Sequence, residues 1–388
     1  MPGTNSPSDL PGRSAHFPAL DGLRGVAVLM VLYWHFIGSD MASPAGTLAG
    51  YLFKLTHHAD SGVDLFFVLS GFLIARILLY EIGTRRWLAR FWIRRTFRIL
   101  PVYFLFLAVS IAVALLQSGR EASHSLDQLP RPLWPYFVML QNFQMAWADS
   151  FGPWGHLWSL AVEEQFYLVF PFVLPVPGVR RWLPGVALAA MVLSTILRMN
   201  ASELSGYVLP QCRLDGLAIG ACLGSLSVRE RSWAWIAQRP AIVRSGTLLG
   251  LAGLAAITLR SQHRHSIDHT VFALSYGALL LDVVAFPASR LARVLSIRSL
   301  MFLGVISYPL YLFHSLCEWL VVGSKGVDLP LTTCLSFALV TTPLSIVVAW
   351  AINRWFGDPF LDWGRRLATH LRSTESAVPL AIGEVYAK

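Results

Sequence analysis

Arg24 and His35 lie eleven residues apart in an apolar stretch near the start of the chain, with only uncharged residues between them. In an α-helix, eleven residues return to nearly the same face about 16 Å further along the axis, and Asp21 lies on that face too. Ionisable side chains within a membrane helix are costly and by default mark functional sites. A lone histidine there is often only a buried, hydrogen-bonded residue, but the arginine on the same face favours a catalytic pair.

A second apolar stretch, residues 62–81, carries the carboxylate Asp64 close to its first residue. A carboxylate at this position could orient a histidine. The stretch also contains Ser70 and Gly71, small residues of the kind that let membrane helices approach closely. We expect a packing role for both.

Two adjacent carboxylates, Glu163 and Glu164, interrupt the apolar stretch 158–176. They cannot both face lipid without a large cost, so at least one must point into the protein. Glu163 shares a helix face with Ser159 and Tyr167 through its i±4 spacing. Either a site carboxylate or a structural ion pair would satisfy this pattern. The candidate counter-charges are Arg198 and Arg213.

Near the other end of the chain, Ser307, Tyr311 and His314 form a polar stripe on an otherwise apolar predicted helix. Pro309 lies within this stripe and frees a backbone carbonyl, because proline has no N–H. A polar stripe beside a kink suits the wall of a cavity.

Arginines are concentrated in residues 85–98, where aromatic residues alternate with them. One interpretation is an amphipathic segment at the membrane surface that contacts anionic lipid headgroups. The other is a cytoplasmic surface that attracts a polyanionic cosubstrate, for which the candidate ligands are Arg94, Arg95 and Arg98. The two interpretations are compatible.

Motifs of several common enzyme classes do not occur in the sequence, namely a phosphate loop, a Rossmann fingerprint, a Gly-x-Ser-x-Gly elbow and paired metal-binding histidines on a helix. His57, His58 and Asp60 lie close together in one loop but give only weak support for a metal site. We therefore expect no metal and no tightly bound cofactor.

The composition indicates a membrane protein. Only 14% of the 388 residues are charged and 55% are hydrophobic, whereas a soluble domain carries roughly 25% charge. Uncharged apolar runs recur along the chain, and a membrane helix needs about 20 such residues. We predict an all-α, polytopic membrane helix bundle of about ten transmembrane helices. The predicted spans are 20–38, 62–81, 99–117, 158–176, 184–199, 210–226, 243–259, 270–287, 299–322 and 331–353.

The arginines also predict the orientation, because cytoplasmic loops are enriched in Lys and Arg. If residues 133–147 do not cross, most loop arginines fall on one side and both termini are cytoplasmic, whereas a crossing there would largely remove this bias. We therefore expect 133–147 to be a re-entrant or interfacial segment on the outer side. On this orientation Arg24 lies toward the cytoplasm and His35 toward the outer side. The expected organisation is a disordered cytoplasmic tail (1–18), a transmembrane domain (19–356) and a cytoplasmic C-terminal tail (357–388).

Four motifs resemble the acyltransferase family 3, the bacterial membrane O-acyltransferases. In family order they are residues 20–24 with His35, an Arg-x10-His signature, and residues 62–72, 158–167 and 306–314. The resemblance covers essentially residues 18–360. It implies the ten-helix core and a multi-pass protein of the bacterial inner membrane. Many members carry an additional soluble domain after this core, and we expect none here.

The resemblance implies transfer of an acetyl or other short acyl group from acyl-CoA, in the first place acetyl-CoA, to a hydroxyl of a surface or exported carbohydrate. His35 is then the expected general base, because histidine titrates close to neutral pH. Arg24 is expected to bind or polarise the acyl donor, while Glu163 and Asp64 hold the site together electrostatically. The residues expected to bind the phosphates of CoA are Arg94, Arg95 and Arg98.

Three other functions fit parts of the pattern. The acceptor could be a macrolide or a similar glycosylated small molecule. A secondary transporter or flippase could use His35, Glu163 and His314 as a proton relay, although no repeat with paired broken helices is evident in the sequence. A structural subunit of a polysaccharide complex would not need the Arg24 and His35 pair. The expected partners are acyl-CoA, the acceptor and the lipid bilayer, and not nucleic acid.

Overall fold

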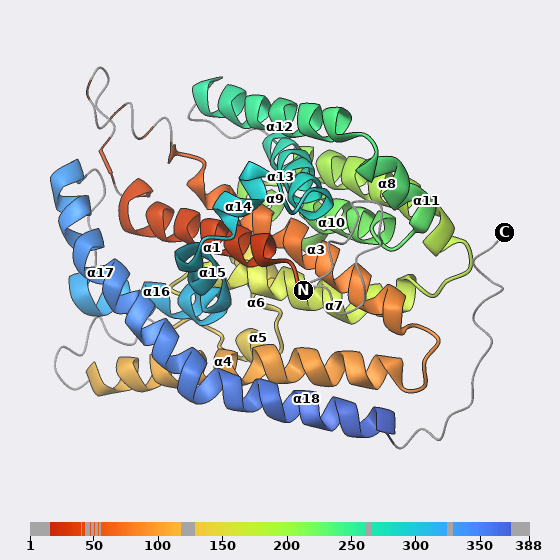
Figure 1. Cartoon of the computed structure of the whole chain (residues 1–388). Coiled ribbons are helices and arrows are strands. Elements are labelled where there is room, and N and C mark those ends of the chain that lie inside the picture. Colours follow the sequence, from red (N-terminus) through yellow and green to blue (C-terminus); the bar gives the residue numbers. More distant parts are fainter. Residues whose placement is uncertain are drawn as a thin grey trace.

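The computed structural model describes residues 16–39, 41–42, 47, 50, 53, 56–117, 129–260, 266–323 and 329–373, and the regular structure there is helical (Figure 1). Most of the long helices lie side by side along a common direction. This arrangement confirms the predicted all-α helix bundle. Parts of the two predicted tails, residues 1–15 and 374–388, lie outside the described residues.

Seven helical segments of the described chain are long and apolar enough to cross a membrane, or eight if one bent pair counts as a span. They are α1 with η1 (Pro18–Gly38), η2 with α3 (Ala59–Glu81), α4 (Trp87–Gln117), α8 (Val179–Met199), α12 (Pro240–Arg260), α13 (Asp268–Ala285) and α17 with η6 and α18 (Leu331–Leu371). The bent pair consists of α15 (Arg298–Val305) and α16 (Ser307–Val322). The chain is therefore a multi-pass membrane protein.

The two remaining predicted spans correspond to α7 (Trp158–Val173) and α10 (Leu214–Leu226), which have 16 and 13 residues. At 1.5 Å per residue these helices are about 24 and about 20 Å long, shorter than a hydrocarbon core of about 30 Å. The number of ten spans and the cytoplasmic location of both termini stay predictions. The shorter elements are α5 (Trp134–Phe137), α6 (Gln141–Ala148), η4 (Gly155–Leu157), α9 (Glu203–Val208), η5 (Pro210–Cys212), α11 (Glu230–Ala237) and α14 (Arg290–Leu295).

Residues 133–147 form α5 and α6, which have only four and eight residues and cannot cross a membrane. Polar residues of this segment form hydrogen bonds with α7 and with Leu157, the residue just before α7. Gln141 Nε2 donates to Leu157 O (2.9 Å), and Asn142 Nδ2 donates to Gln165 Oε1 (3.2 Å). The prediction that this segment is not a span is confirmed.

The bend of 75° between α15 and α16 has a local cause. Pro309 has no N–H to donate to the carbonyl of Val305, four residues earlier, so α15 ends at Val305 and a new helix begins at Ser307. The Ser307 hydroxyl donates to the carbonyl of Gly304 (2.9 Å) and satisfies one of the freed acceptors at the end of α15.

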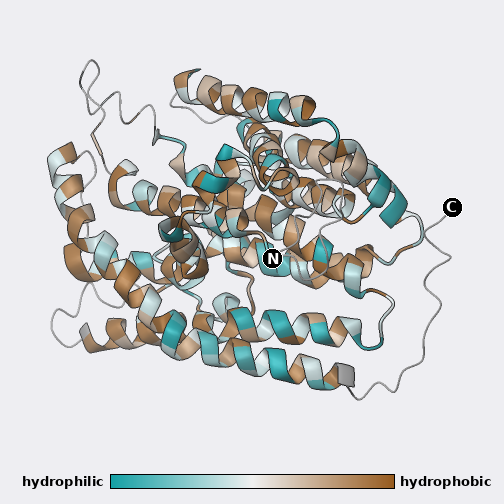
Figure 2. Ribbon diagram, viewed as in Figure 1, coloured by the Kyte–Doolittle hydropathy of each residue, from teal (hydrophilic) through white to brown (hydrophobic). Residues whose placement is uncertain are grey.

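The basic segment 85–98 is not a loop but includes the first half of α4, which begins at Trp87. The helix that contains the third predicted span therefore begins well before residue 99, the predicted start of that span. Residues Asp358–Ser373 of the predicted C-terminal tail form α18, which lies beside α4 (Figure 1). The rings of Phe97 and Trp363 join the two helices with a centroid separation of 5.0 Å. Hydrophilic residues recur along both helices in this region (Figure 2).

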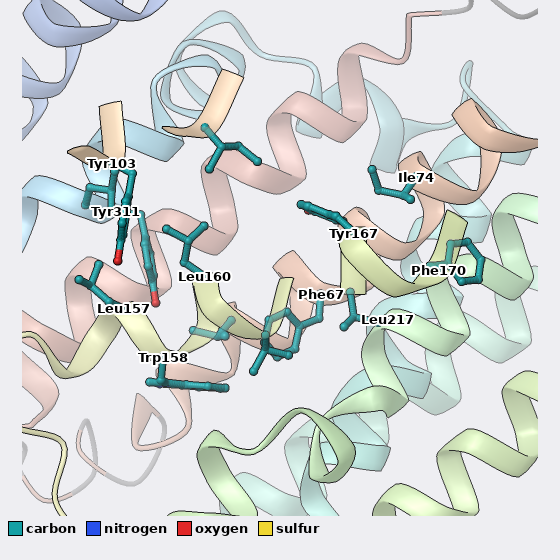
Figure 3. Close-up of a cluster of buried hydrophobic side chains, with 14 of the residues drawn as sticks. Phe67, Ile74, Tyr103, Leu157, Trp158, Leu160, Tyr167, Phe170, Leu217 and Tyr311 are labelled. Carbon is teal, nitrogen blue, oxygen red and sulfur yellow. The ribbon is translucent and has the colours of Figure 1, made fainter. Parts of the chain in front are cut away.

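Helix α3 is in close contact with α10 through glycines on both helices. A Cβ atom at Gly71 would lie 2.1 Å from Leu217 O, and a Cβ atom at Gly220 would lie 2.1 Å from Val68 O. The two backbones therefore touch, which confirms the predicted packing role of Gly71. Around this contact lies a cluster of large buried side chains that joins α3, α7 and α10, labelled in Figure 3.

Candidate functional site

A small cavity of about 100 Å³ lies between α1, α3, α4, α7 and α16. Its charged lining residues are Arg24, Arg95, Arg98 and Glu163, and we call it the basic pocket. The Glu163 carboxylate is held by two donors, because its Oε1 accepts from Ser70 Oγ (2.8 Å) and its Oε2 accepts from Tyr167 Oη (3.0 Å). Three guanidinium groups face one carboxylate, so the pocket favours an anionic ligand.

The structure separates the arginines that the sequence grouped together. Arg95 lies in the basic pocket with its guanidinium 5.0 Å from the ring centroid of Tyr167. Arg94 does not line this pocket and instead forms an ion pair with Glu81. Besides the packing role expected for it, Ser70 donates a hydrogen bond from its hydroxyl to Glu163.

A second cavity, of about 480 Å³, contains His35 and His156, and we call it the His35 cavity. His35 lies in η1 (Trp34–Gly38), a π-helical turn at the end of α1. Such turns are rare and often occur at functional sites. The His35 ring packs against the buried ring of His314 with a centroid separation of 4.7 Å, and the ring of His156 lies 5.2 Å from that of His314.

Backbone carbonyls of α16 determine the tautomers of His314 and His156, since a carbonyl only accepts hydrogen bonds. His314 Nδ1 donates to Tyr311 O (2.7 Å), which leaves Nε2 as an unprotonated acceptor. This Nε2 is buried and has no hydrogen-bond partner in the described part of the chain. His156 Nε2 donates to Leu312 O (3.2 Å). Burial, and then the neighbouring His314, lower the pKa of His156 well below its ordinary value.

The basic pocket and the His35 cavity meet at Val63 and Tyr311, which line both. The Tyr311 hydroxyl donates to the carbonyl of His156 (2.7 Å) and lies 2.5 Å from Ser159 Oγ, which can donate to it. The predicted polar stripe of α16 is confirmed, since it lines the basic pocket, the junction and the surroundings of His35 in turn through Ser307, Tyr311 and His314.

A third cavity, of about 1190 Å³, adjoins the His35 cavity and shares no lining residue with the basic pocket, and we call it the outer groove because it lies beyond the His35 cavity as seen from that pocket. Four residues line both, namely Trp34, Phe151, Gly152 and Tyr207. Further side chains along the outer groove include His57, Asp149, Arg198, Glu203 and His269. Arg24 and His35, which the sequence placed on one helix face, thus open into two different but adjoining spaces.

Asp64 lies behind the outer groove and does not line the His35 cavity. Its carboxylate accepts from Arg213 Nη2 (2.7 Å) and lies 3.3 Å from His269 Nδ1, so the histidine that it orients is His269. Arg198 pairs with Asp215 (2.9 Å). The expectation that Arg198 and Arg213 neutralise the glutamates was therefore wrong. Because 149 residues separate Asp64 from Arg213, no local pattern in the sequence indicates this pair.

His156 and Tyr207 were not among the residues predicted from the sequence, although His156 comes two residues before the motif at residues 158–167. Asp60, which lies close to His57 and His58 in the sequence, accepts a hydrogen bond on its carboxylate from Tyr207 Oη (2.9 Å). Across the described residues, no cluster of three or more His, Cys, Asp or Glu side chains is arranged to hold a metal ion.

Replacement of Arg213 by methionine is expected to destabilise the fold strongly. The change leaves the Asp64 carboxylate buried without its partner, and breaking a buried ion pair in this way costs about 3–5 kcal/mol. The apparent melting temperature of the detergent-purified protein should fall accordingly. The control is Arg365→Met, because Arg365 pairs with Asp362, the two side chains are 63% and 60% exposed, and such surface pairs contribute little. Equal destabilisation by the two substitutions would contradict the assignment.

Comparison with known proteins identifies relatives across most of the chain. A family model described as an acyltransferase domain matches residues 17–354. The peptidoglycan O-acetyltransferase OatA of Listeria monocytogenes is 29% identical over 330 residues, which are 77% of this chain and 49% of the relative. The O-acetyltransferase OatA of Staphylococcus aureus is 28% identical over 323 residues, which are 77% of this chain and 50% of the relative.

A putative O-acetyltransferase of Staphylococcus aureus is 30% identical over 374 residues, which are 90% of this chain and 58% of the relative. The chain thus spans about half the length of the curated relatives that it matches. No solved structure matches it.

Proposed function

Because the chain belongs to acyltransferase family 3, we propose that it is an O-acyltransferase that transfers an acetyl or other short acyl group from acyl-CoA to a hydroxyl of a surface or exported carbohydrate. One observation carries this proposal. A basic pocket and a cavity that contains a histidine meet at Val63 and Tyr311, so an anionic donor and a hydroxyl acceptor can approach one point from two directions.

The basic pocket supports a donor with phosphate groups and a small reacting end. Phosphate oxygens accept charge-assisted hydrogen bonds from guanidinium groups, and the pocket offers those of Arg24, Arg95 and Arg98. Its volume of about 100 Å³ is far below the 300–1,000 Å³ typical of pockets for drug-sized ligands. Only a small part of the donor would fit there, with a phosphate group at these arginines, and the rest of CoA would lie outside the pocket.

His35 is the proposed general base. It removes the proton from the acceptor hydroxyl, the hydroxyl oxygen bonds to the thioester carbonyl carbon, and the carbon–sulfur bond breaks. The sulfur leaves as a thiolate and takes the proton from His35, so the products are an ester and free CoA. His314 would position His35, because its buried Nε2 can accept a hydrogen bond from the neighbouring imidazole. Arg24 would stabilise the negative charge on the carbonyl oxygen.

The proposed acceptor is a carbohydrate, as the name of the Listeria monocytogenes relative, a peptidoglycan O-acetyltransferase, suggests. A macrolide or another glycosylated metabolite is the alternative acceptor. We propose a location in the bacterial inner membrane, with the basic pocket toward the cytoplasm and the His35 cavity toward the outer side. Family membership favours acyl transfer over the transporter hypothesis.

Transfer from acyl-CoA is tested with the purified protein in liposomes and acetyl-CoA labelled in the acetyl group. We expect release of free CoA that depends on added acceptor, together with label in an ester of that acceptor. Empty liposomes provide the background rate. If the label stays in acetyl-CoA with both carbohydrate and macrolide acceptors, the donor assignment is wrong.

A further inference from the structure

We propose that the outer groove is an extended acceptor site, in which the sugar units next to the reacting unit of an oligosaccharide bind. This inference rests on the proposed function, because it assigns the reacting sugar unit to the His35 cavity. It adds a binding site at a distance from the transfer chemistry, with a neutral or weakly charged oligosaccharide as its ligand.

The outer groove and the His35 cavity adjoin, because Trp34, Phe151 and Tyr207 line both. In this proposal the oligosaccharide extends from one cavity into the other at these residues. The His35 cavity measures about 480 Å³, which already lies within the range for a single small ligand. The groove adds about 1190 Å³ that one reacting sugar unit would leave unused.

The lining of the groove suits sugar units. A pyranose ring has an apolar face of C–H groups and a rim of hydroxyls, so it binds best between aromatic rings and mixed polar groups. Rings of Trp34, Phe151 and Tyr207 lie along the groove, and the carboxylates of Asp149 and Glu203 lie beside them. Asp149 and Glu203 are exposed residues, so their carboxylate oxygens can accept hydrogen bonds from sugar hydroxyls.

Buried ion pairs make the wall of the groove rigid. Arg198 lies on that wall and is held by Asp215 (2.9 Å) and by Ser266 O (2.6 Å). Tyr207 is held by Asp60, and the His269 ring is held between Asp64 and Arg213. Each buried charge is expensive, and the acyl transfer step uses none of them. We infer that these ion pairs hold the groove wall in its binding conformation, because a wall that is already ordered loses less side-chain entropy when a ligand binds.

The test compares binding of N-acetylglucosamine with binding of its β-1,4-linked tetramer, measured by titration of the protein in lipid nanodiscs without any acyl donor. We expect the tetramer to bind at least about 10-fold more tightly. Ala201→Trp places a large ring in the groove at a position outside the His35 cavity, and it should abolish this preference. The matched control is Asn200→Trp, since Asn200 is exposed and does not line the groove.

Equal binding of the two sugars, or a preference for the tetramer that survives Ala201→Trp, overturns the proposal. Binding of N-acetylglucosamine that is unchanged in Ala201→Trp shows that the variant is folded. As a second variant, Asp149→Ala with Glu203→Ala should weaken tetramer binding without adding any bulk to the groove. A protein that binds the tetramer but transfers no acyl group contradicts the proposed function and leaves the groove assignment intact, so the two failures are distinguishable.

Discussion

Replacement of His35 by alanine is expected to lower kcat for acyl transfer by about 100- to 10,000-fold, the usual contribution of a positioned general base. The KM for acyl-CoA should change little, because the arginines that would bind the donor lie in the basic pocket, which His35 does not line. The measurement is the initial rate of ester formation at several donor concentrations, with the purified enzyme in liposomes.

The histidine control for this experiment is His370→Ala. His370 is exposed, lies in α18 and lines none of the three cavities. We expect unchanged kinetics for this variant. If His35→Ala is obtained in normal yield and keeps full kcat, His35 is not the base.

Arg95→Gln and Arg98→Gln are each expected to raise the KM for acyl-CoA by about 10- to 100-fold while kcat changes less. A hydrogen bond to a charged group contributes about 1.5–3 kcal/mol, and each 1.4 kcal/mol corresponds to a factor of ten. The two side chains line the basic pocket, so the loss should appear in donor binding. The measurement is the dependence of the transfer rate on acyl-CoA concentration.

Arg94→Gln is the matched control, because Arg94 lies on the same helix but pairs with Glu81 outside the basic pocket. The sequence alone predicts equal effects for Arg94, Arg95 and Arg98, whereas the structure predicts an unchanged KM for the first. An increase in KM with Arg94→Gln as large as with its neighbours would indicate attraction by a diffuse basic surface and would contradict a defined pocket.

In the proposed reaction, the residues changed in His35→Ala, Arg95→Gln and Arg98→Gln act at different steps. Arg95 and Arg98 would act on the donor before transfer, and His35 would act on the acceptor during transfer. The Tyr311 hydroxyl lies between the two spaces, where the carbonyl of His156 and the Ser159 hydroxyl hold it. Donor and acceptor would therefore meet only at this junction, and each would reach it from its own cavity.

The sequence by itself determined the helical segments and the candidate residues within them. A long apolar run forms a helix in a membrane because every backbone polar group must be satisfied inside the segment. The eleven-residue spacing of Arg24 and His35 and the stripe of Ser307, Tyr311 and His314 depend only on helix geometry. Arg24, Ser307 and Tyr311 line the basic pocket, His35 and Tyr311 line the His35 cavity, and His314 packs against His35.

Only the tertiary structure decided which charges meet. Asp64 pairs with Arg213 rather than serving His35, and Glu163 is held by Ser70, 93 residues away, rather than by Arg198 or Arg213. Helix periodicity specifies the face on which a side chain lies, but the packing of whole helices specifies its neighbour. The glycines that bring α3 against α10 set such neighbours by allowing the backbones to touch. The division into a basic pocket, a His35 cavity and an outer groove follows from that packing and could not be read from any single segment.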